Sequence, residues 1–490
     1  GSINLNTTDA LGAGTINIGG NRYFHAYSPV VADRNIFVGY QAGNFSMAGT
    51  GVQASFNQGI GSYSLSSLTT GYQNTAQGSS SMYFLQSGKD NTAMGYGSLR
   101  GNISGDNNTT FGSWSLYNST ASNLTAVGYE SLRSNTTGTG LVAVGYQAGR
   151  YNVKGTNNSY FGYQAGYSGT TVVSSITITN GGTGYTAGDL IVDNTGTGGT
   201  GLAGTYTVDG SGTINGITIT NNGSGYNSAP VVTPQAGGTS AVLTPVLVSA
   251  SENTATGYRA LYSNTRGSNN TANGYQSLRN NTSGGGNTAY GMYSLFNNTT
   301  VSNLTAVGYD SFRNNTTGTG LVAVGYQAGR QNVKGTNNSY FGYQAGYSGT
   351  TVVSSITITN GGTGYTAGNL IVDNTGTGGT GLAGTYTVDG SGTINGITIT
   401  NNGSGYNSAP VVTPQAGGTS AVLTPVLLSA DYNTANGYQS LYSNTSGSSN
   451  TANGYASLRS NTTGSFNTAN GYNSLYSNTT GNYNTANGVY

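Results

Sequence analysis

The sequence predicts an all-β protein, a parallel β-solenoid or β-roll of 17-residue coils with two small all-β insert domains. The first observation is a period, because Gly-Tyr pairs recur every 17 residues, as at Gly308, Gly325 and Gly342. This period fits one solenoid coil and is too short for a pair of helices. The second is composition: 83 of 490 residues are glycine, and Asn, Thr and Ser are also poor helix formers. The third is that two segments leave the period for alternating strands and glycine-rich turns.

These changes of pattern divide the chain into six segments. They are an N-terminal cap or attachment region (1–52), solenoid repeats (53–172), a first insert (173–250), repeats (251–352), a second insert (353–430) and final repeats (431–490). Residues 123–250 recur at 303–430 with only six differences, so the inserts are near-identical copies. An irregular coil is expected near Gly39, within the first segment.

Equivalent residues of successive coils should lie above one another at the strand spacing of about 4.8 Å. We expect a tyrosine column and an inward-facing leucine column. The predicted members are Tyr258, Tyr275, Tyr309, Tyr326 and Tyr343, and Leu261, Leu278 and Leu295. Asparagines such as Asn253 and Asn287 should form an amide ladder at a corner. The glycine before each tyrosine predicts a backbone conformation closed to other residues, or a close approach of backbone.

Each coil offers a core only one alanine, one leucine and part of a tyrosine. A single stack would therefore have a thin core, and several chains around one axis would bury more apolar surface. We expect self-association into a homotrimer, a head-to-tail polymer, or both, because solenoid ends also need caps or stacking.

The repeat Asn-Thr-Ala-x-Gly-Tyr-x-Ser-Leu, with a clean copy at 450–458, resembles the shafts of trimeric phage tail fibres and bacterial surface fibres. Residues 35–45 are similar to the opening element of that family. Heads of trimeric autotransporter adhesins are a more distant parallel. In the family, such repeats often precede an endosialidase-type intramolecular chaperone, which this sequence does not contain.

The resemblance implies a non-enzymatic structural subunit of an extracellular, cell-surface or virion fibre that gives reach and attachment. The implied partners are other copies of the chain and host or environmental glycans or surface proteins. Two alternatives stay open: a homopolymeric glycosylated surface filament, and a carbohydrate-degrading tailspike.

Composition excludes several kinds of site. The chain has no cysteine, which rules out disulfides and cysteine-ligated metals. A net charge of +1 gives no field for nucleic acid, and no apolar run is long enough for a membrane span. We therefore predict no cofactor, no metal, no nucleic-acid partner and no membrane span.

The inventory of catalytic groups is also poor. His25 is the only imidazole, and we interpret it as a surface or capping residue. Asp189 and Asp193 could form a glycosidase pair, but the equivalent of Asp189 in the second insert is Asn369. Residues 196–201 match a dinucleotide fingerprint without the flanking helix, which indicates a turn. Asp209 and Asp389 could each hold an isolated calcium ion. We predict no catalytic residue.

Two repeat positions have alternative interpretations. Asparagines in N-x-S/T sequons would carry rows of glycans or serve as turn residues. The sequon asparagines are Asn135, Asn281, Asn298, Asn315, Asn444, Asn461 and Asn478. Arginines after the leucine would bind anionic glycans as a ladder or form a solvated face interrupted by uncharged coils. These arginines are Arg100, Arg133, Arg279, Arg313 and Arg459.

Overall fold

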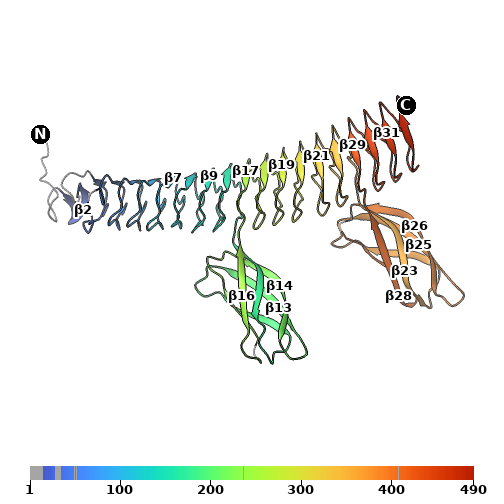
Figure 1. Cartoon of the computed structure of the whole chain (residues 1–490), viewed down its shortest axis with the longest axis horizontal. Coiled ribbons are helices and arrows are strands. Elements are labelled where there is room, and N and C mark those ends of the chain that lie inside the picture. The colour runs from blue at the N-terminus through green and yellow to red at the C-terminus, as the bar shows by residue number, and fades with distance from the viewer. Residues whose placement is uncertain are drawn as a thin grey trace. The chain divides into compact units, whose positions relative to one another are not determined.

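The computed structural model describes residues 15–27, 35–48, 50, 52–235, 237–406, 408–415 and 417–490. These residues form strands, turns and bends, and no helix among them could cross a membrane. The chain divides into two compact units, Gly1–Asn270 (unit 1) and Thr271–Tyr490 (unit 2). Each unit combines a stack of short strands with one insert (Figure 1). The all-β solenoid with two all-β inserts is therefore confirmed.

Nine short strands stack in parallel within the described part of unit 1. They are β3 (Ile36–Val38), β4 (Gln58–Ile60), β5 (Thr75–Gln77), β6 (Thr92–Met94), β7 (Thr109–Phe111), β8 (Thr125–Val127), β9 (Val142–Val144), β10 (Ser159–Phe161) and β17 (Thr254–Thr256). Each residue pairs with its equivalent one coil later, as Thr92 does with Thr109. β10 pairs in the same way with β17, so the insert between them does not interrupt the stack.

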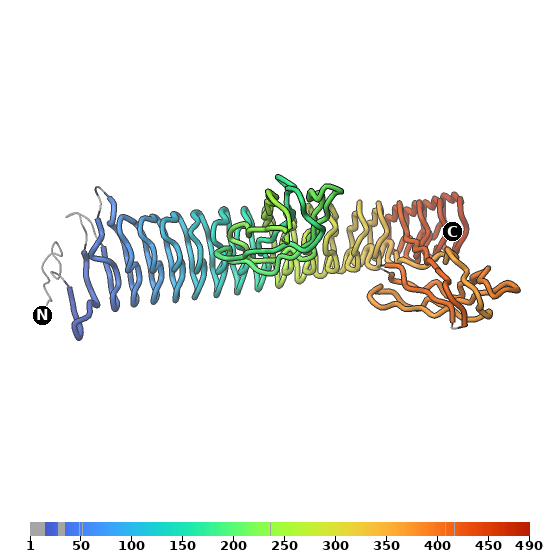
Figure 2. The backbone as a smooth tube through the Cα atoms, turned by 90° about the horizontal axis from the view of Figure 1, so that it is seen from below, coloured from blue at the N-terminus to red at the C-terminus, as the bar shows by residue number. Residues whose placement is uncertain are grey.

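Unit 2 repeats this arrangement with nine strands. They are β18 (Thr271–Asn273), β19 (Thr288–Tyr290), β20 (Thr305–Val307), β21 (Val322–Val324), β22 (Ser339–Phe341), β29 (Thr434–Asn436), β30 (Thr451–Asn453), β31 (Thr468–Asn470) and β32 (Thr485–Asn487). Figure 2 shows the coils as successive loops of backbone.

An antiparallel hairpin precedes the first coil. β1 (Ile16–Ile18) pairs with β2 (Asn21–His25), and β2 pairs antiparallel with β3. The hairpin occupies one edge of the parallel stack, which is how solenoids block an open edge. β3 already stacks on β4, so the segment predicted as a cap also contains the first coil. Residues 1–14, 28–34, 49 and 51 of that predicted segment lie outside the described residues.

The inside of each coil holds very few side chains. The middle strand residue points inward, and Ala272 and Ala289 are fully buried, as are Leu278 and Leu295. Main-chain hydrogen bonds then join one coil to the next, such as Leu295 N–H to the Ser311 carbonyl at 3.1 Å. The stack is therefore held together more by repeated hydrogen bonds than by a wide core.

Where a larger side chain points into the core, neighbouring core positions have glycine, which has no side chain. Tyr160 replaces the small residue in β10 and is 2% exposed. Glycines replace the core leucine in its own coil and in the preceding coil, as Gly166 and Gly149, and a Cβ on either would overlap the Tyr160 ring. Tyr340 repeats the arrangement in unit 2 with Gly346 and Gly329. Core volume is thus conserved across neighbouring coils.

The inserts are six-stranded antiparallel sheets. The first contains β11 (Val172–Asn180), β12 (Gly188–Asp193), β13 (Thr200–Val208), β14 (Ile214–Ser224), β15 (Val231–Pro234) and β16 (Val242–Val248) in the order β11-β16-β15-β12-β13-β14. The second contains β23 (Val352–Thr363), β24 (Gly368–Asp373), β25 (Thr380–Val388), β26 (Ile394–Ser404), β27 (Val411–Pro414) and β28 (Thr419–Leu428) in the equivalent order. Alternating residues of each sheet, such as Leu202 and Tyr206, face its own core.

Candidate functional site

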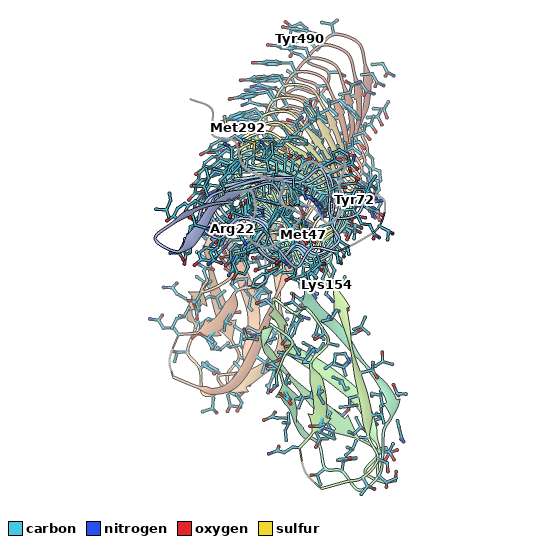
Figure 3. The ribbon with its side chains drawn as sticks, turned by 90° about the vertical axis from the view of Figure 1, so that its left-hand side faces the viewer. Arg22, Met47, Tyr72, Lys154, Met292 and Tyr490 are labelled. Atoms are coloured by element: carbon cyan, nitrogen blue, oxygen red, sulfur yellow. The ribbon has the colours of Figure 1, made fainter. Side chains whose placement is uncertain are left out.

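The tyrosines form stacked columns at the corner after each strand. In unit 2, the Tyr309, Tyr326 and Tyr343 rings lie nearly parallel, with centroids 5.1 and 5.0 Å apart. In unit 1, Tyr258 stacks on Tyr163 at 5.1 Å. Tyr275 meets Tyr293 edge-on at 5.5 Å instead, because Met292, labelled in Figure 3, takes the next column position. Stacking leaves ring edges facing solvent, and Tyr326 is 42% exposed.

The leucines lie on the opposite side of the backbone, inside the coil. Leu261, Leu278 and Leu295 are fully buried. Each has a φ near +50°, in the left-handed region that side-chain-bearing residues rarely adopt. This conformation turns the chain sharply after the tyrosine corner while it directs the side chain inward.

Amide ladders lie just before the strands and are interrupted where leucine takes the asparagine position, at Leu124, Leu141, Leu304 and Leu321. The Asn450 side chain donates to Asn433 Oδ1 at 3.2 Å and to the Gly464 carbonyl at 2.9 Å. Its own Oδ1 accepts from the main-chain and side-chain nitrogens of Asn467, at 3.0 and 3.1 Å. Asn253 belongs to the equivalent ladder of unit 1, and Asn287 to that of unit 2. Each asparagine thus satisfies polar groups of three coils.

The sequon asparagines form a second buried ladder, which favours the turn role over the alternative of carrying glycans. The Asn461 Nδ2, where a glycan would attach, donates to the Gly464 carbonyl at 2.8 Å and to Asn444 Oδ1 at 2.9 Å. Asn135, Asn281, Asn298, Asn315 and Asn444 are also at most 2% exposed, and each donates to the main-chain carbonyl three residues later. Asn478 makes the same bond and is half-buried. In the folded coil these residues are turn-forming.

A third column forms a directed hydrogen-bond relay, which the sequence reasoning missed. In unit 1, Arg259 Nε donates to Gln164 at 2.9 Å, Gln164 to Gln147 at 2.8 Å, and Gln147 to Glu130 at 2.8 Å. In unit 2 the relay runs from Arg459 through Gln439 and Gln344 to Gln327. Glutamines spaced by one period in Gly-Tyr-Gln were the available signal.

The arginines form a column with aromatic residues, which we call the arginine–aromatic column. In unit 1 it contains Arg100, Tyr117, Arg133, Arg150, Tyr167 and Tyr262. In unit 2 it contains Arg279, Phe296, Arg313, Arg330, Tyr347, Tyr442, Arg459 and Tyr476. The coils between the predicted arginines have aromatic rings at this position, or the further arginines Arg150 and Arg330.

Two buried carboxylates organise part of this column. Glu130 contacts Arg133 at 3.2 Å and Arg150 at 2.9 Å, and Asp310 contacts Arg313 at 3.4 Å and Arg330 at 2.9 Å. Guanidinium groups also lie over rings, as Arg100 does 4.8 Å from the centroid of Phe84. These contacts fix the arginines before any ligand arrives.

His25 was predicted to be a surface or capping residue; it is buried in the N-terminal hairpin that pairs with the first coil, so only the surface alternative is wrong. Its ring is 1% exposed and packs against Phe37 and Phe45, at centroid distances of 4.7 and 4.6 Å. Nε2 donates to the Ala42 carbonyl at 2.8 Å, and Nδ1 accepts the Tyr27 N–H at 3.2 Å. These partners select the neutral ring, and burial lowers the pKa of His25 to about 4, with the nearby Arg22 charge contributing.

We expect the hairpin to lose stability as the pH falls from about 6.5 to 4. Over that range the unfolded chain binds a proton that folded His25 excludes, so up to about 3 kcal/mol is lost and the curve is flat above pH 7. Hydrogen exchange of β2 against pH measures this, and the single imidazole gives one NMR titration. The His25→Phe variant should lack the pH dependence; an NMR pKa near 6.5 would contradict the prediction.

The candidate aspartates of the inserts do not have a catalytic or ion-binding arrangement. Asp189 and Asp193 are four residues apart on β12, about 13 Å along a strand, which exceeds the separation that glycosidases use. Asp209 Oδ1 accepts the N–H groups of Ser211 and Thr213, both at 2.9 Å, so it serves its own hairpin turn. Asp389 does the same in the second insert. Among the described residues, no three His, Cys, Asp or Glu side chains group as metal ligands would.

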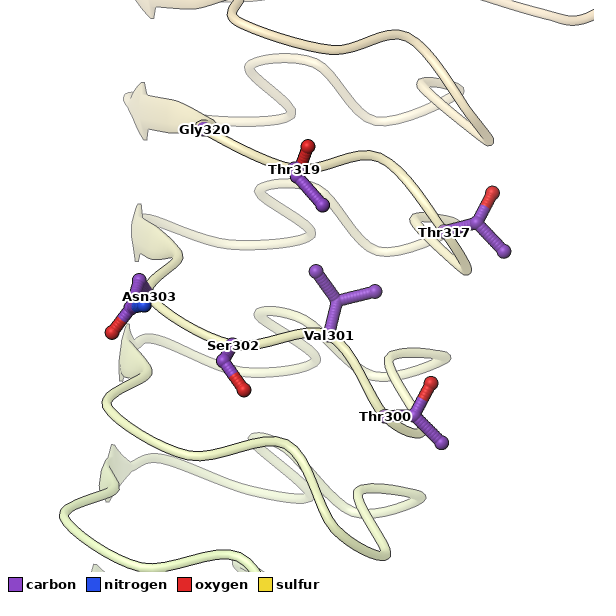
Figure 4. Close-up of a pocket in the computed structure, with 7 residues that line it drawn as sticks. All are labelled: Thr300, Val301, Ser302, Asn303, Thr317, Thr319 and Gly320. Carbon is purple, nitrogen blue, oxygen red and sulfur yellow. The ribbon is translucent and has the colours of Figure 1, made fainter.

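A shallow groove lies between two neighbouring coils of unit 2 (Figure 4). It is lined by Thr300, Val301, Ser302, Asn303, Thr317, Thr319 and Gly320 and encloses 620 Å³. None of these side chains titrates near neutral pH, so the groove offers hydrogen bonds and no acid or base.

No family model, curated protein or solved structure matches this chain.

Proposed function

We propose that this chain is a structural subunit of an extracellular, cell-surface or virion fibre that provides reach and attachment. One observation carries the proposal: each coil pairs its strand in parallel and in register with the strand of the next, so each stack extends along a single direction by repeating one contact. Such a fold gains length without gaining width. The resemblance of the repeats to fibre shafts supports the same role.

Self-association as a homotrimer is part of the proposal. In unit 2, an apolar stripe is formed by Val307, Val324 and Phe341, together with the stacked Tyr309, Tyr326 and Tyr343. Val324 and Phe341 are 37% and 40% exposed, although each coil buries little apolar surface. Continuous exposed apolar surface of this kind marks protein–protein contact, and a second copy with the same stripe would cover it.

Light scattering of the purified chain tests the association. We expect three times the chain mass of 49.6 kDa, or an open series of larger species if the chain is a filament subunit. Val324→Glu should reduce the mass, whereas Thr317→Glu, an exposed residue of the shallow groove, should not. A stable monomer would contradict both the trimer and the polymer.

The inserts are proposed as contact modules on this shaft. The two ends of the first insert meet, since Thr171 Oγ1 lies 2.8 Å from Ser249 Oγ. Asn253 binds Asn158 of the preceding coil although 95 residues separate them, which is one period plus 78 residues. The Ala250 carbonyl accepts Asn158 Nδ2 at 2.9 Å, as the Val301 carbonyl accepts Asn287 Nδ2 in an uninterrupted coil.

Deleting residues 172–249 should therefore leave a closed 17-residue coil in which Thr171 joins Ala250. We expect the thermal midpoint of the shaft and the number of copies in the assembly to be unchanged, and binding to a target surface to weaken. Deleting residues 172–254, five residues more, removes Asn253 and the first residue of β17 and serves as the control, which should unfold the neighbouring coils. Loss of assembly in the in-register deletion would show that the inserts belong to the shaft.

A further inference from the structure

We propose that the arginine–aromatic column is a binding surface for an extended acidic polysaccharide. The inference rests on the proposed role in attachment and names its ligand class. It starts from the concentration of positive charge on one repeat position of an almost neutral chain.

The columns carry most of the positive charge. In unit 1, Arg133 and Arg150 contact one carboxylate, Glu130, whereas Arg100 and the adjoining Arg259 lie over aromatic rings. In unit 2, Arg313 and Arg330 contact Asp310, whereas Arg279 and Arg459 lie over aromatic rings. Four arginines and one carboxylate give each of these two groups a net charge of +3. The whole chain holds 14 basic and 13 acidic residues, so six basic and eleven acidic residues remain elsewhere.

The arginines are positioned for anions. Arg100 donates to the Tyr117 hydroxyl at 3.2 Å and lies over the rings of Tyr83 and Phe84. The Arg133 side chain is 36% exposed although Glu130 holds it, and that of Arg313 is 31% exposed beside Asp310. A guanidinium has five donors in a planar fork, so each retains N–H groups for a carboxylate or sulfate. Because the contacts already restrict the side chains, binding costs little further conformational entropy.

The spacing of the column favours a linear polymer. Equivalent residues repeat at the strand spacing of about 4.8 Å, so arginines of the column recur at intervals of one to three coils along each stack. A polysaccharide with regularly repeated anionic groups can contact several arginines at once. The total affinity is then much higher than that of any single contact.

The aromatic members favour a polysaccharide over nucleic acid. Single-stranded nucleic acids need open ring faces on which bases stack. In this column ring faces are occupied: Tyr167 and Tyr262 stack on each other at 4.9 Å, and guanidinium groups lie over Tyr117 and Tyr476. The excess of acidic residues elsewhere would also repel a densely charged phosphate backbone.

Affinity measurements with defined polymers test this inference. The intact chain should bind heparin, a sulfated polymer, and polygalacturonate, a carboxylated one, and should not bind neutral dextran. The ratio of the two affinities distinguishes sulfate from carboxylate ligands. Failure to bind either polymer would overturn the inference, as would tighter binding of single-stranded poly-dT.

Matched variants separate the column from general charge. Arg100→Gln with Arg279→Gln should lower the affinity at least tenfold, whereas Lys154→Gln with Lys334→Gln, which removes the same charge from another repeat position, should change it less than twofold. Arg100→Lys with Arg279→Lys should recover part of the loss. Equal losses in the two Gln pairs would overturn the inference, provided that circular dichroism shows both folded.

Light scattering on the same samples keeps the two proposals apart. Assembled fibres that bind neither acidic polymer would overturn only the polysaccharide inference. A protein that stays monomeric would overturn the proposal of a fibre subunit. The affinity of its arginine–aromatic column for the acidic polymers could still be measured.

Discussion

Replacing Gly308 by alanine is expected to unfold the coils around it. Gly308 has a φ of 131°, a conformation that is essentially restricted to glycine, and a Cβ there would lie 2.6 Å from the Gly325 carbonyl carbon of the next coil. That atom is backbone held in the ladder, so it cannot move aside. Strain and overlap together should lower the free energy of unfolding by about 3 kcal/mol or more. Thermal unfolding and hydrogen exchange of β19 to β21 measure the effect.

Gly390→Ala is the matched control in the same unit. Gly390 has no atom within 4 Å of an added Cβ and no positive φ, so its replacement should change stability by less than about 1 kcal/mol. If Gly308→Ala left the exchange of β20 unchanged, the close approach of the two glycines would not be a requirement of the fold.

Replacing Asn450 by alanine should have the second largest effect. The substitution removes the donors to Asn433 and Gly464 and the acceptor for Asn467, and it leaves buried polar groups on both neighbouring coils without partners. Each such group costs about 1–3 kcal/mol, so we expect a loss of about 3 kcal/mol, seen as a lower midpoint in urea. Asn450→Asp should also destabilise, because it keeps the acceptor and loses both donors.

Asn453→Ala tests whether position within the coil decides the cost. Asn453 lies three residues further on, is partly exposed, and donates one side-chain hydrogen bond, to Asn470 at 2.9 Å. Its replacement should cost about 1 kcal/mol or less. Equal losses at positions 450 and 453 would show that the corner ladder has no special role.

The period and the chemistry of each repeat position predicted much of the fold. A spacing of 17 residues fixes which residues stack, and an alternation of Thr and Ala is enough to orient a three-residue strand. The positive φ of Leu278 was not predictable, because leucine does not favour that conformation and adopts it only when the surrounding ladder imposes it.

The candidate sites were harder to predict, because the same short sequence motif can have different structural or functional roles. Asn461 in Asn-Thr-Thr is a sequon and also a good turn residue, and only its burial decides between them. Arg150 and Gln147 were missed because their columns change residue type from coil to coil, while His25 gave no periodic signal.

The closed coil at the insert junctions has a consequence for how such chains evolve. Recombination between two copies of the repeat adds or removes a whole number of coils, and each change leaves every donor facing an acceptor. The duplication by 180 residues fits this rule, because it contains six periods and one 78-residue insert. The length of the coil stack can therefore change in steps of about 4.8 Å per coil through a genetic event that needs no compensating mutation.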